Sequence, residues 1–250
     1  MHVNLDEIEE ALTNGHFFLE YLPIMKLEGS ACVGAEALIR WRRQSEVVPP
    51  ADFVPAIENT PLSGLVTYWV METVAHELGD WLRGTERALI TINVPPEILG
   101  RGGLWYVASK CGMLDILGKL VVEVTERGVP DQLGIQALKQ SKKHGLKVCL
   151  DDVGTSDENL VLLMRANIDM MKLDKSFADK MRDPDWSPES MNGLTAFAQS
   201  TPVQVIAEGV ETEFQRNTFR EAGIQMAQGW FFSPPLSAAK FIEFFRANTD

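Results

Sequence analysis

Short apolar runs alternate with helical patterns along almost the whole sequence, and this rhythm constrains the fold more than any other feature. We expect strands at residues 17–23, 33–41, 87–93, 120–126, 146–151, 168–173, 203–207 and 224–227. We expect helices at residues 4–14, 51–58, 62–83, 104–113, 130–144, 159–165, 188–199, 212–222 and 237–248. A repeated strand–helix order predicts an α/β fold, a TIM-like (β/α)8 barrel, rather than a sandwich or a helical bundle. An open doubly wound sheet is the alternative, weakened because no G-x-G-x-x-G follows an early strand.

The chain is interpreted as a single domain of residues 1–250, since it contains no linker, low-complexity run or sequence repeat. No apolar run approaches the roughly 20 residues that span a membrane, and the N-terminus lacks the features of a signal peptide. These observations predict a cytoplasmic protein without a membrane segment. The formal net charge of −12 argues against binding to nucleic acid polymers, which needs clustered Lys and Arg. A small anionic substrate stays possible, because bound divalent cations can reverse the local sign of the charge.

Cysteine and histidine positions restrict the kind of metal that the chain can bind. Cys32, Cys111 and Cys149 show no C-x-x-C spacing, so disulfides and thiolate zinc sites are not expected. The four histidines likewise show no metal-ligand spacing. A bound metal should therefore have oxygen ligands, which favours Mg²⁺, Mn²⁺ or Ca²⁺.

Residues 146–154 form a short apolar run that ends in two adjacent carboxylates and a glycine-containing turn. Side chains alternate faces along a strand, so Asp151 and Asp152 cannot both point inward from regular geometry. If both serve one site, we expect Asp152 just past the strand end, where the chain bends. Two acids held close repel each other unless a cation lies between them. A plain strand followed by an Asp-rich turn is the alternative.

Polar residues also recur at or near the C-terminal ends of other expected strands, where barrel enzymes carry their chemistry. The full set is Asn93, Glu126, Asp151, Asp152, Lys172, Glu208 and Gln228. On the strand at 33–41, Glu36, Leu38 and Arg40 share a face, which fits either an ion pair or a metal and a phosphate bound side by side. Glu123 interrupts an apolar strand, where an acid is costly to bury unless it is paired or metal-bound.

Seven short motifs follow one another in the order typical of a known family. They are Glu36-Ala37-Leu38, Ile92-Asn93-Val94, Val122-Glu123-Val124-Thr125-Glu126, Asp151-Asp152-Val153-Gly154-Thr155, Lys172-Leu173-Asp174, Ala207-Glu208-Gly209-Val210-Glu211-Thr212 and Gln228-Gly229. With these motifs the chain resembles, over nearly its whole length, the EAL domain family of phosphodiesterases that act on the bacterial second messenger cyclic di-GMP. A lone E-A-L would carry no weight, but seven ordered motifs make a chance match very improbable.

The resemblance implies a barrel with one antiparallel strand near its start and a catalytic centre with two divalent cations, Mg²⁺ or Mn²⁺. It implies a first cation held by Glu36, Asn93, Glu123 and Asp151, and a second held by the bridging Asp151 with Asp152 and Glu208. Lys172 would position or help to deprotonate the attacking water, so the catalytic set is Lys172, Glu36, Asp152 and Glu208. The implied substrate contacts are Leu22, Leu38, Arg40, Asn93 and Gln228, and Glu126 and Glu211 would support the metal ligands.

The chemistry of a phosphodiester is consistent with this set. Two cations close together acidify a bridging water and neutralise the charge that develops during attack on an anion. Their charge would also depress the pKa of Lys172, so that it could share a proton near neutral pH. Ca²⁺ is expected to inhibit, because it prefers longer bonds and more ligands and acidifies water less.

The chain departs from the family pattern at two places. Leu22 stands in Tyr21-Leu22-Pro23 where the family has a ligand-contacting Gln, which should loosen binding by about 1 kcal/mol. In the loop at 154–159, Ser156 replaces a Gly and two acids, Asp157 and Glu158, are gained; in the family this loop connects the metal site to a dimer interface. The intact set of acids predicts an active phosphodiesterase that forms linear pGpG, with activity lowered by Leu22 and the altered loop, and the resemblance implies a homodimer. A cyclic di-GMP receptor or protein-interaction module without turnover, which Leu22 and the loop favour, is the alternative, and an unrelated two-acid barrel hydrolase is remote.

Overall fold

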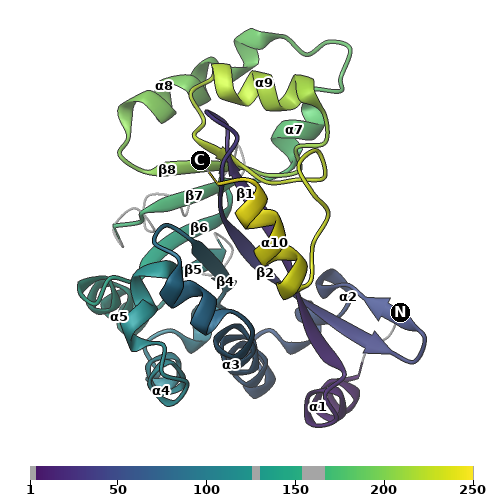
Figure 1. The fold of residues 1–250 in the computed structure, drawn as a ribbon, viewed down its shortest axis with the longest axis vertical. Helices are drawn as coiled ribbons and strands as arrows, with labels where there is room; N and C mark the ends of the chain where they lie inside the picture. The colour runs from purple at the N-terminus through teal and green to yellow at the C-terminus, as the bar shows by residue number, and fades with distance from the viewer. Residues whose placement is uncertain (1–3, 126–129, 154–166, 250) are drawn as a thin grey trace.

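The computed structural model describes residues 4–125, 130–153 and 167–249, and its strands form a barrel (Figure 1). The strands are β1 (Phe17–Lys26), β2 (Cys32–Arg43), β3 (Glu46–Val48), β4 (Leu89–Asn93), β5 (Leu120–Thr125), β6 (Lys147–Val153), β7 (Met170–Leu173), β8 (Gln204–Ala207) and β9 (Met226–Ala227). They lie in the order β1-β9-β8-β7-β6-β5-β4-β2-β3, and β1 also pairs with β2, which closes the sheet and leaves β3 outside the ring. β1 is antiparallel to β2 and β9, and the other pairings within the ring are parallel. The predicted TIM-like barrel with one antiparallel strand near the N-terminus is confirmed.

Helices surround this barrel. They are α1 (Leu5–Thr13), α2 (Pro50–Ile57), α3 (Pro61–Gly84), α4 (Gly103–Lys110), α5 (Gln132–Lys143), α7 (Ser176–Lys180), α8 (Asn192–Ser200), α9 (Glu213–Glu221) and α10 (Ala238–Ala247), with 3-10 turns η1 (Pro96–Ile98), η2 (Leu114–Lys119) and η3 (Pro188–Met191). The short elements β3, α7, η1 and η2 were not predicted, because they are too short to show a periodic pattern. The helix expected at 188–199 begins as the 3-10 turn η3, and the helix expected at 159–165 lies outside the described residues. Among the helices described, none is long and apolar enough to cross a membrane.

Two apolar clusters hold the barrel together. The larger lies between the outward faces of the strands and the helices, and α3 contributes the fully buried Val74, Leu78 and Leu82. The smaller fills the inside of the barrel and contains Ile24, Val121, Cys149, Met170, Ile206 and Met226. The barrel interior is therefore packed with side chains and is not an open channel.

Local sequence signals set several helix ends. Asn4 accepts a hydrogen bond from the Asp6 amide, and the Glu7 side chain accepts one from the Asn4 amide, which is a capping box for α1. Thr212 and Gln215 form the same arrangement at the start of α9. This second box ends the loop that follows β8, and so it helps to fix the backbone next to the predicted site residue Glu208.

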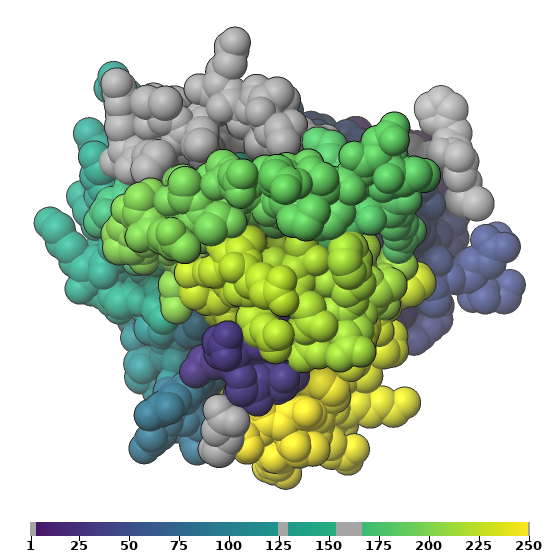
Figure 2. Space-filling model, turned by 90° about the horizontal axis from the view of Figure 1, so that it is seen from above, coloured from purple at the N-terminus to yellow at the C-terminus, as the bar shows by residue number. Residues whose placement is uncertain are grey.

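The turn between β1 and β2 lies against the C-terminal part of the chain. The Leu27 amide donates to the Gln225 carbonyl at 3.0 Å, and the Cys32 amide donates to the Asn248 carbonyl at 2.8 Å. Figure 2 shows this dark purple turn between the yellow-green and yellow segments of the C-terminal region. The first and last strands of the ring thus meet beside this turn, where β1 pairs with β9 and closes the barrel.

Candidate metal centre at the mouth of the barrel

The predicted site residues come together one layer above the apolar interior of the barrel. A strand directs every second side chain to the same face, so the residue two positions beyond an interior side chain also points inward. The resulting pairs are Val121 with Glu123, Cys149 with Asp151, Met170 with Lys172, Ile206 with Glu208 and Met226 with Gln228. On the antiparallel β1 the direction is reversed, so Leu22 lies above Ile24 and opposite Glu36 in the β1–β2 register. Leu22 is therefore part of the same layer as the predicted metal ligands.

Lys172 lies at the centre of this layer and is 1% exposed. Its Nζ lies 2.8 Å from Glu36 Oε2 and 2.8 Å from Glu208 Oε1. It lies 3.2 Å from Asp151 Oδ1 and 3.3 Å from Glu123 Oε2. One ammonium group therefore faces four carboxylates that come from four different strands or their extensions.

Two amide side chains orient Glu36 within this cluster. Asn93 Nδ2 donates to Glu36 Oε1 at 2.9 Å, and Gln228 Nε2 donates to Glu36 Oε2 at 2.7 Å. The same Gln228 nitrogen donates to Glu208 Oε1 at 2.8 Å, so it joins the carboxylates of β2 and the β8 end. With both donors aimed at carboxylates, the amide oxygens of the two side chains face other directions. Thr91, which sequence analysis missed, is buried opposite Glu36 in the β2–β4 register, at the inward position before Asn93.

The carboxylates form two groups that share one residue. The ligand oxygens of Glu36, Glu123 and Asp151 all lie within 4.8 Å of one another, and so do those of Asp151, Asp152 and Glu208. The buried oxygens Glu123 Oε1, Asp151 Oδ1 and Gln228 Oε1 accept no hydrogen bond from any described residue, although Asp151 Oδ1 keeps its charge contact with Lys172. Unpartnered buried oxygens in an all-oxygen donor set fit two hard divalent cations with Asp151 between them.

A bend inside β6 allows both adjacent aspartates to reach the site. Asp152 has φ of 57°, in the left-handed region, and the β6–β7 register shifts between Leu150 and Val153. This irregularity breaks the strict alternation of faces, so Asp151 and Asp152 can share a group of ligands. The prediction that Asp152 lies just past the strand end is wrong in detail, because β6 continues through Val153. The backbone strain at Asp152 takes the place of the expected bend after the strand.

Burial and mutual repulsion shift the pKa values of the cluster. Burial lowers the pKa of Lys172, but the four carboxylates outweigh that effect and hold the pKa well above its usual range. Burial, with help from the charges of Asp151 and Glu36, raises the pKa of Glu208 to about 8 against the opposing effect of Lys172. Burial likewise raises the pKa of Asp151 and of Glu123. Glu36 differs, because Lys172 and the two amides overcome its burial and lower its pKa. Without cations, the site thus contains a charged lysine beside an ionised Glu36, while Glu123, Asp151 and Glu208 resist ionisation.

The rim above this layer is formed by the outer parts of β1 and β2. Arg40 Nε donates to Glu20 Oε2 at 2.8 Å, and Arg40 Nη1 donates to the Ile39 carbonyl at 3.1 Å. Glu20 pairs with Leu38 in the β1–β2 register, so it lies on the face that carries Glu36, Leu38 and Arg40. The sequence left open an ion pair between Glu36 and Arg40, but the partner of Arg40 is Glu20. Glu20 was not singled out, because the pairing depends on the register of two antiparallel strands.

The glycine of the Gln228-Gly229 motif has a steric role. Gly229 has φ of 150°, and a Cβ there would lie 2.2 Å from the Val210 carbonyl oxygen and 2.4 Å from the Val210 nitrogen. The Val210 amide donates to the Gln228 carbonyl at 3.2 Å, which holds the segments after β8 and β9 together. Only glycine fits this close approach, and the approach places Gln228 within reach of Glu208.

Three predicted features remain untested by these contacts. The carboxylate of Glu211 accepts a hydrogen bond from Arg182 Nη2 at 2.6 Å and is half exposed, so its support of the metal ligands stays a prediction. Glu126 and the loop at 154–159 lie outside the described residues.

Comparison with known proteins identifies the family. The EAL domain family model matches residues 5–235. This chain is an EAL domain. The EAL domain is 28% identical over 246 residues to the probable cyclic di-GMP phosphodiesterase PdeB of Escherichia coli. This alignment covers 94% of this chain and 46% of PdeB. It is 30% identical over 250 residues to the cyclic di-GMP phosphodiesterase NbdA of Pseudomonas aeruginosa, covering 97% of this chain and 32% of NbdA.

Solved structures agree with this assignment. The EAL domain superposes on the PaMucR phosphodiesterase in its c-di-GMP complex with a TM-score of 0.84 and 25% identity, covering 95% of this chain and 98% of that chain. The EAL domain spans less than half of the length of PdeB and of NbdA. The activities of these longer relatives therefore belong to the proposals that follow.

Proposed function

We propose that this EAL domain is a metal-dependent phosphodiesterase that hydrolyses cyclic di-GMP to linear pGpG. The observation that carries the proposal is the pair of carboxylate groups that share Asp151 and surround Lys172. The names of PdeB and NbdA and the c-di-GMP complex of PaMucR support the substrate.

The donor set fits two cations, and Mg²⁺ or Mn²⁺ suits oxygen ligands of this kind. Glu36, Asn93, Glu123 and Asp151 would hold one cation, and Asp151, Asp152 and Glu208 would hold the other. When bound, the two cations would supply an activated water and neutralise charge on the phosphate. Ca²⁺ is expected to inhibit the reaction, because its longer bonds and larger ligand number do not suit a site shaped for smaller ions.

The residues of the chain then divide the remaining work. Lys172 lies within hydrogen-bond distance of Glu36 and Glu208, so it is placed to orient an oxygen between the two carboxylate groups and to hold its proton. Asn93 and Gln228 fix the orientation of Glu36. The water oxygen forms a bond to phosphorus, the phosphorus–oxygen bond to the ribose breaks, and the departing oxygen takes up a proton.

The rim contributes the contacts to the substrate. Arg40 is the cationic side chain on the β2 face that carries Glu36 and Leu38, and a guanidinium suits a phosphate group. Leu22 and Leu38 would offer apolar contacts to the rest of the dinucleotide. Because Glu20 holds Arg40 in the substrate-free arrangement, part of the affinity for the phosphate is expected to be lost in breaking this pair.

Leu22 also favours a second candidate function, a cyclic di-GMP receptor or protein-interaction module without turnover. It places an apolar side chain in the layer of the ligands, opposite Glu36, where the family pattern has a hydrogen-bonding Gln. A protein that binds but does not turn over its ligand needs fewer of the catalytic contacts.

One assay distinguishes the two functions. The protein is incubated with cyclic di-GMP and Mg²⁺ or Mn²⁺, and linear pGpG is measured by chromatography. Parallel reactions contain excess chelator, or Ca²⁺ in place of the other ions. Formation of pGpG that chelator abolishes supports the phosphodiesterase. Saturable binding of cyclic di-GMP without product supports the receptor, and full turnover in chelator rules out the metal mechanism.

We further propose that the domain acts in the cytoplasm as a homodimer. Cys32, Cys111 and Cys149 are free thiols, which is typical of a reducing compartment. The dimer rests on the family role of the loop at 154–159 and is tested by light scattering, where a mass of one chain would contradict it.

A further inference from the structure

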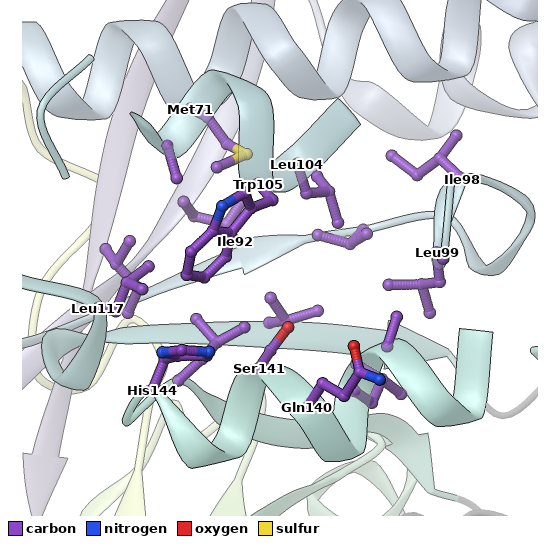
Figure 3. A pocket seen from close by; sticks show the side chains of 18 of the residues that line it. Met71, Ile92, Ile98, Leu99, Leu104, Trp105, Leu117, Gln140, Ser141 and His144 are labelled. Atoms are coloured by element: carbon purple, nitrogen blue, oxygen red, sulfur yellow. The ribbon is translucent and has the colours of Figure 1, made fainter. Parts of the chain in front are cut away.

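A cavity of about 390 Å³ lies outside the barrel, between α4, α5 and the outward faces of β4 and β5 (Figure 3). Ile92 of β4 and Val122 of β5 are among the residues that line it, and Trp105 projects into it from α4. Gln140 and Ser141 of α5, and His144 directly after this helix, project toward it on the opposite side. The cavity is thus a space between helices and sheet, on the outer side of the barrel wall.

The chemistry of the walls is uneven. Most of the lining is aliphatic or aromatic, and the polar side chains come from the single helix α5 and its end. Among the described residues that line the cavity there is no Asp, Glu, Lys or Arg. The Trp105 and His144 rings approach each other across the gap between the helices, with centroids 4.8 Å apart and planes tilted by 54°. Trp105 is 44% exposed, so these two rings border an opening to solvent.

The size of this space sets it apart from ordinary packing defects. Protein interiors are close-packed, and the few voids that exist are mostly near the size of a water molecule. The cavity falls within the roughly 300–1,000 Å³ typical of sites for small molecules. Apolar walls with a few convergent polar groups are also typical of such sites.

We propose that this cavity binds an uncharged aromatic molecule of about two fused rings that carries one hydrogen-bonding group. The ligand is uncharged because the walls offer no counter-ion, and burying an unpaired charge is costly. It is aromatic because the Trp105 and His144 rings offer a surface for edge-to-face contact at the opening. It carries one polar group because the polar side chains are confined to the α5 side.

The cavity is separate from the metal centre but shares strands with it. Ile92 and Val122 point outward, and the next residues point inward, Asn93 toward Glu36 and Glu123 toward Lys172. The thickness of the sheet therefore separates the two sites. Binding in the cavity does not depend on the proposed phosphodiesterase activity, and it can be measured without cyclic di-GMP or cations.

The probe is 2-naphthol, and naphthalene-2-sulfonate is its charged counterpart. Isothermal titration should show saturable binding of 2-naphthol and at least about tenfold weaker binding of the sulfonate. Ala137→Phe places a ring in the cavity from α5 and should abolish binding. Gln136→Phe adds the same ring to the exposed part of the same helix and should leave binding intact. Equal binding by the wild type and Ala137→Phe would overturn the proposal, as would the absence of saturable binding by the wild type.

Two further measurements keep the test valid if Ala137→Phe does not fold. His144→Phe retains a ring beside Trp105 but removes its hydrogen-bonding nitrogens. The variant should bind 2-naphthol about fivefold more weakly than the wild type does and should bind naphthalene with unchanged affinity. In two-dimensional ¹H–¹⁵N NMR spectra of the wild-type protein, 2-naphthol should shift the indole N–H signal of Trp105. This signal is assigned by its absence from the spectrum of Trp105→Phe. A Trp105 signal that does not move at saturation contradicts the proposed site.

Discussion

Replacing Lys172 by methionine tests how the four buried carboxylates are held together. The substitution keeps the length and apolar stem of the side chain but removes the ammonium group, which lies 2.8–3.3 Å from the carboxylates of Glu36, Glu208, Asp151 and Glu123. Breaking a buried ion pair by removing one partner typically costs about 3–5 kcal/mol, because it leaves uncompensated charge. We expect the free energy of unfolding of Lys172→Met to be lower than that of the wild type by this amount in excess chelator.

The loss translates into a change in melting temperature. For a chain of this length, 1 kcal/mol corresponds to about 2–4 °C, so Lys172→Met should melt about 10 °C below the wild type in chelator. Saturating Mn²⁺ should raise the melting temperature of Lys172→Met above its value in chelator, because a ligand at about 100 times its Kd stabilises the folded state by about 2.7 kcal/mol. Lys172→Met should nevertheless not hydrolyse the substrate in Mn²⁺, because no other described cationic side chain lies at the centre of the cluster.

Differential scanning calorimetry in chelator and in Mn²⁺ measures both effects. Lys240→Met on the exposed side of α10 is the matched control, and it should melt like the wild type under both conditions. A drop of less than about 3 °C for Lys172→Met in chelator would refute the idea that this ammonium compensates the carboxylates. A melting temperature of Lys172→Met that Mn²⁺ does not raise would refute the idea that cations bind among these carboxylates.

Four further outcomes are expected. Glu36→Ala should lower the rate of hydrolysis by more than the roughly 100-fold typical of a residue that only supports a metal ligand, and its melting temperature in Mn²⁺ should stay near that of the wild type. A rate near that of the wild type would show that Glu36 has only a structural role. Leu22→Gln should lower KM about fivefold through one added hydrogen bond, and an unchanged KM would remove Leu22 from the substrate pocket. Glu20→Gln should release Arg40 and also lower KM with kcat unchanged, whereas a raised KM would show that Glu20 positions Arg40 productively. In chelator, the melting temperature should fall as the pH rises from about 5 through about 8. In this range the folded domain holds a proton on Glu208 that the unfolded chain has released, and this proton stabilises the folded state less as the pH rises. A melting temperature that does not change with pH would contradict this.

The alternation of strand side chains explains why much of the site could be predicted from the sequence. Glu123 and Lys172 each follow an apolar inward residue by two positions, and this spacing is visible without any structure. The order of the seven motifs then predicted that these strands belong to one barrel. Local periodicity, which a single strand determines by itself, indicated which polar side chains share a face, but the assignment of metal ligands rested on the resemblance to the EAL domain family.

The features that were missed depend on contacts between distant segments. The left-handed φ of Asp152 arises at a register shift between β6 and β7, so the strand continues where a bend was expected. The Glu20–Arg40 pair depends on the β1–β2 register, and the cavity depends on how Trp105 of α4 meets His144 beyond α5. None of these relations has a signature within one short stretch of sequence.

The reversed direction of β1 decides how a mechanical force on the start of the domain would act. In an all-parallel barrel the first strand begins at the end opposite the active site. Here β1 begins at the mouth, with Phe17 opposite Trp41, and the Glu7 carboxylate of α1 lies 2.7 Å from Arg43 Nη2 at the end of β2. A pull on α1 therefore reaches Glu20 and Arg40 along the rim itself, without being transmitted through the packed interior.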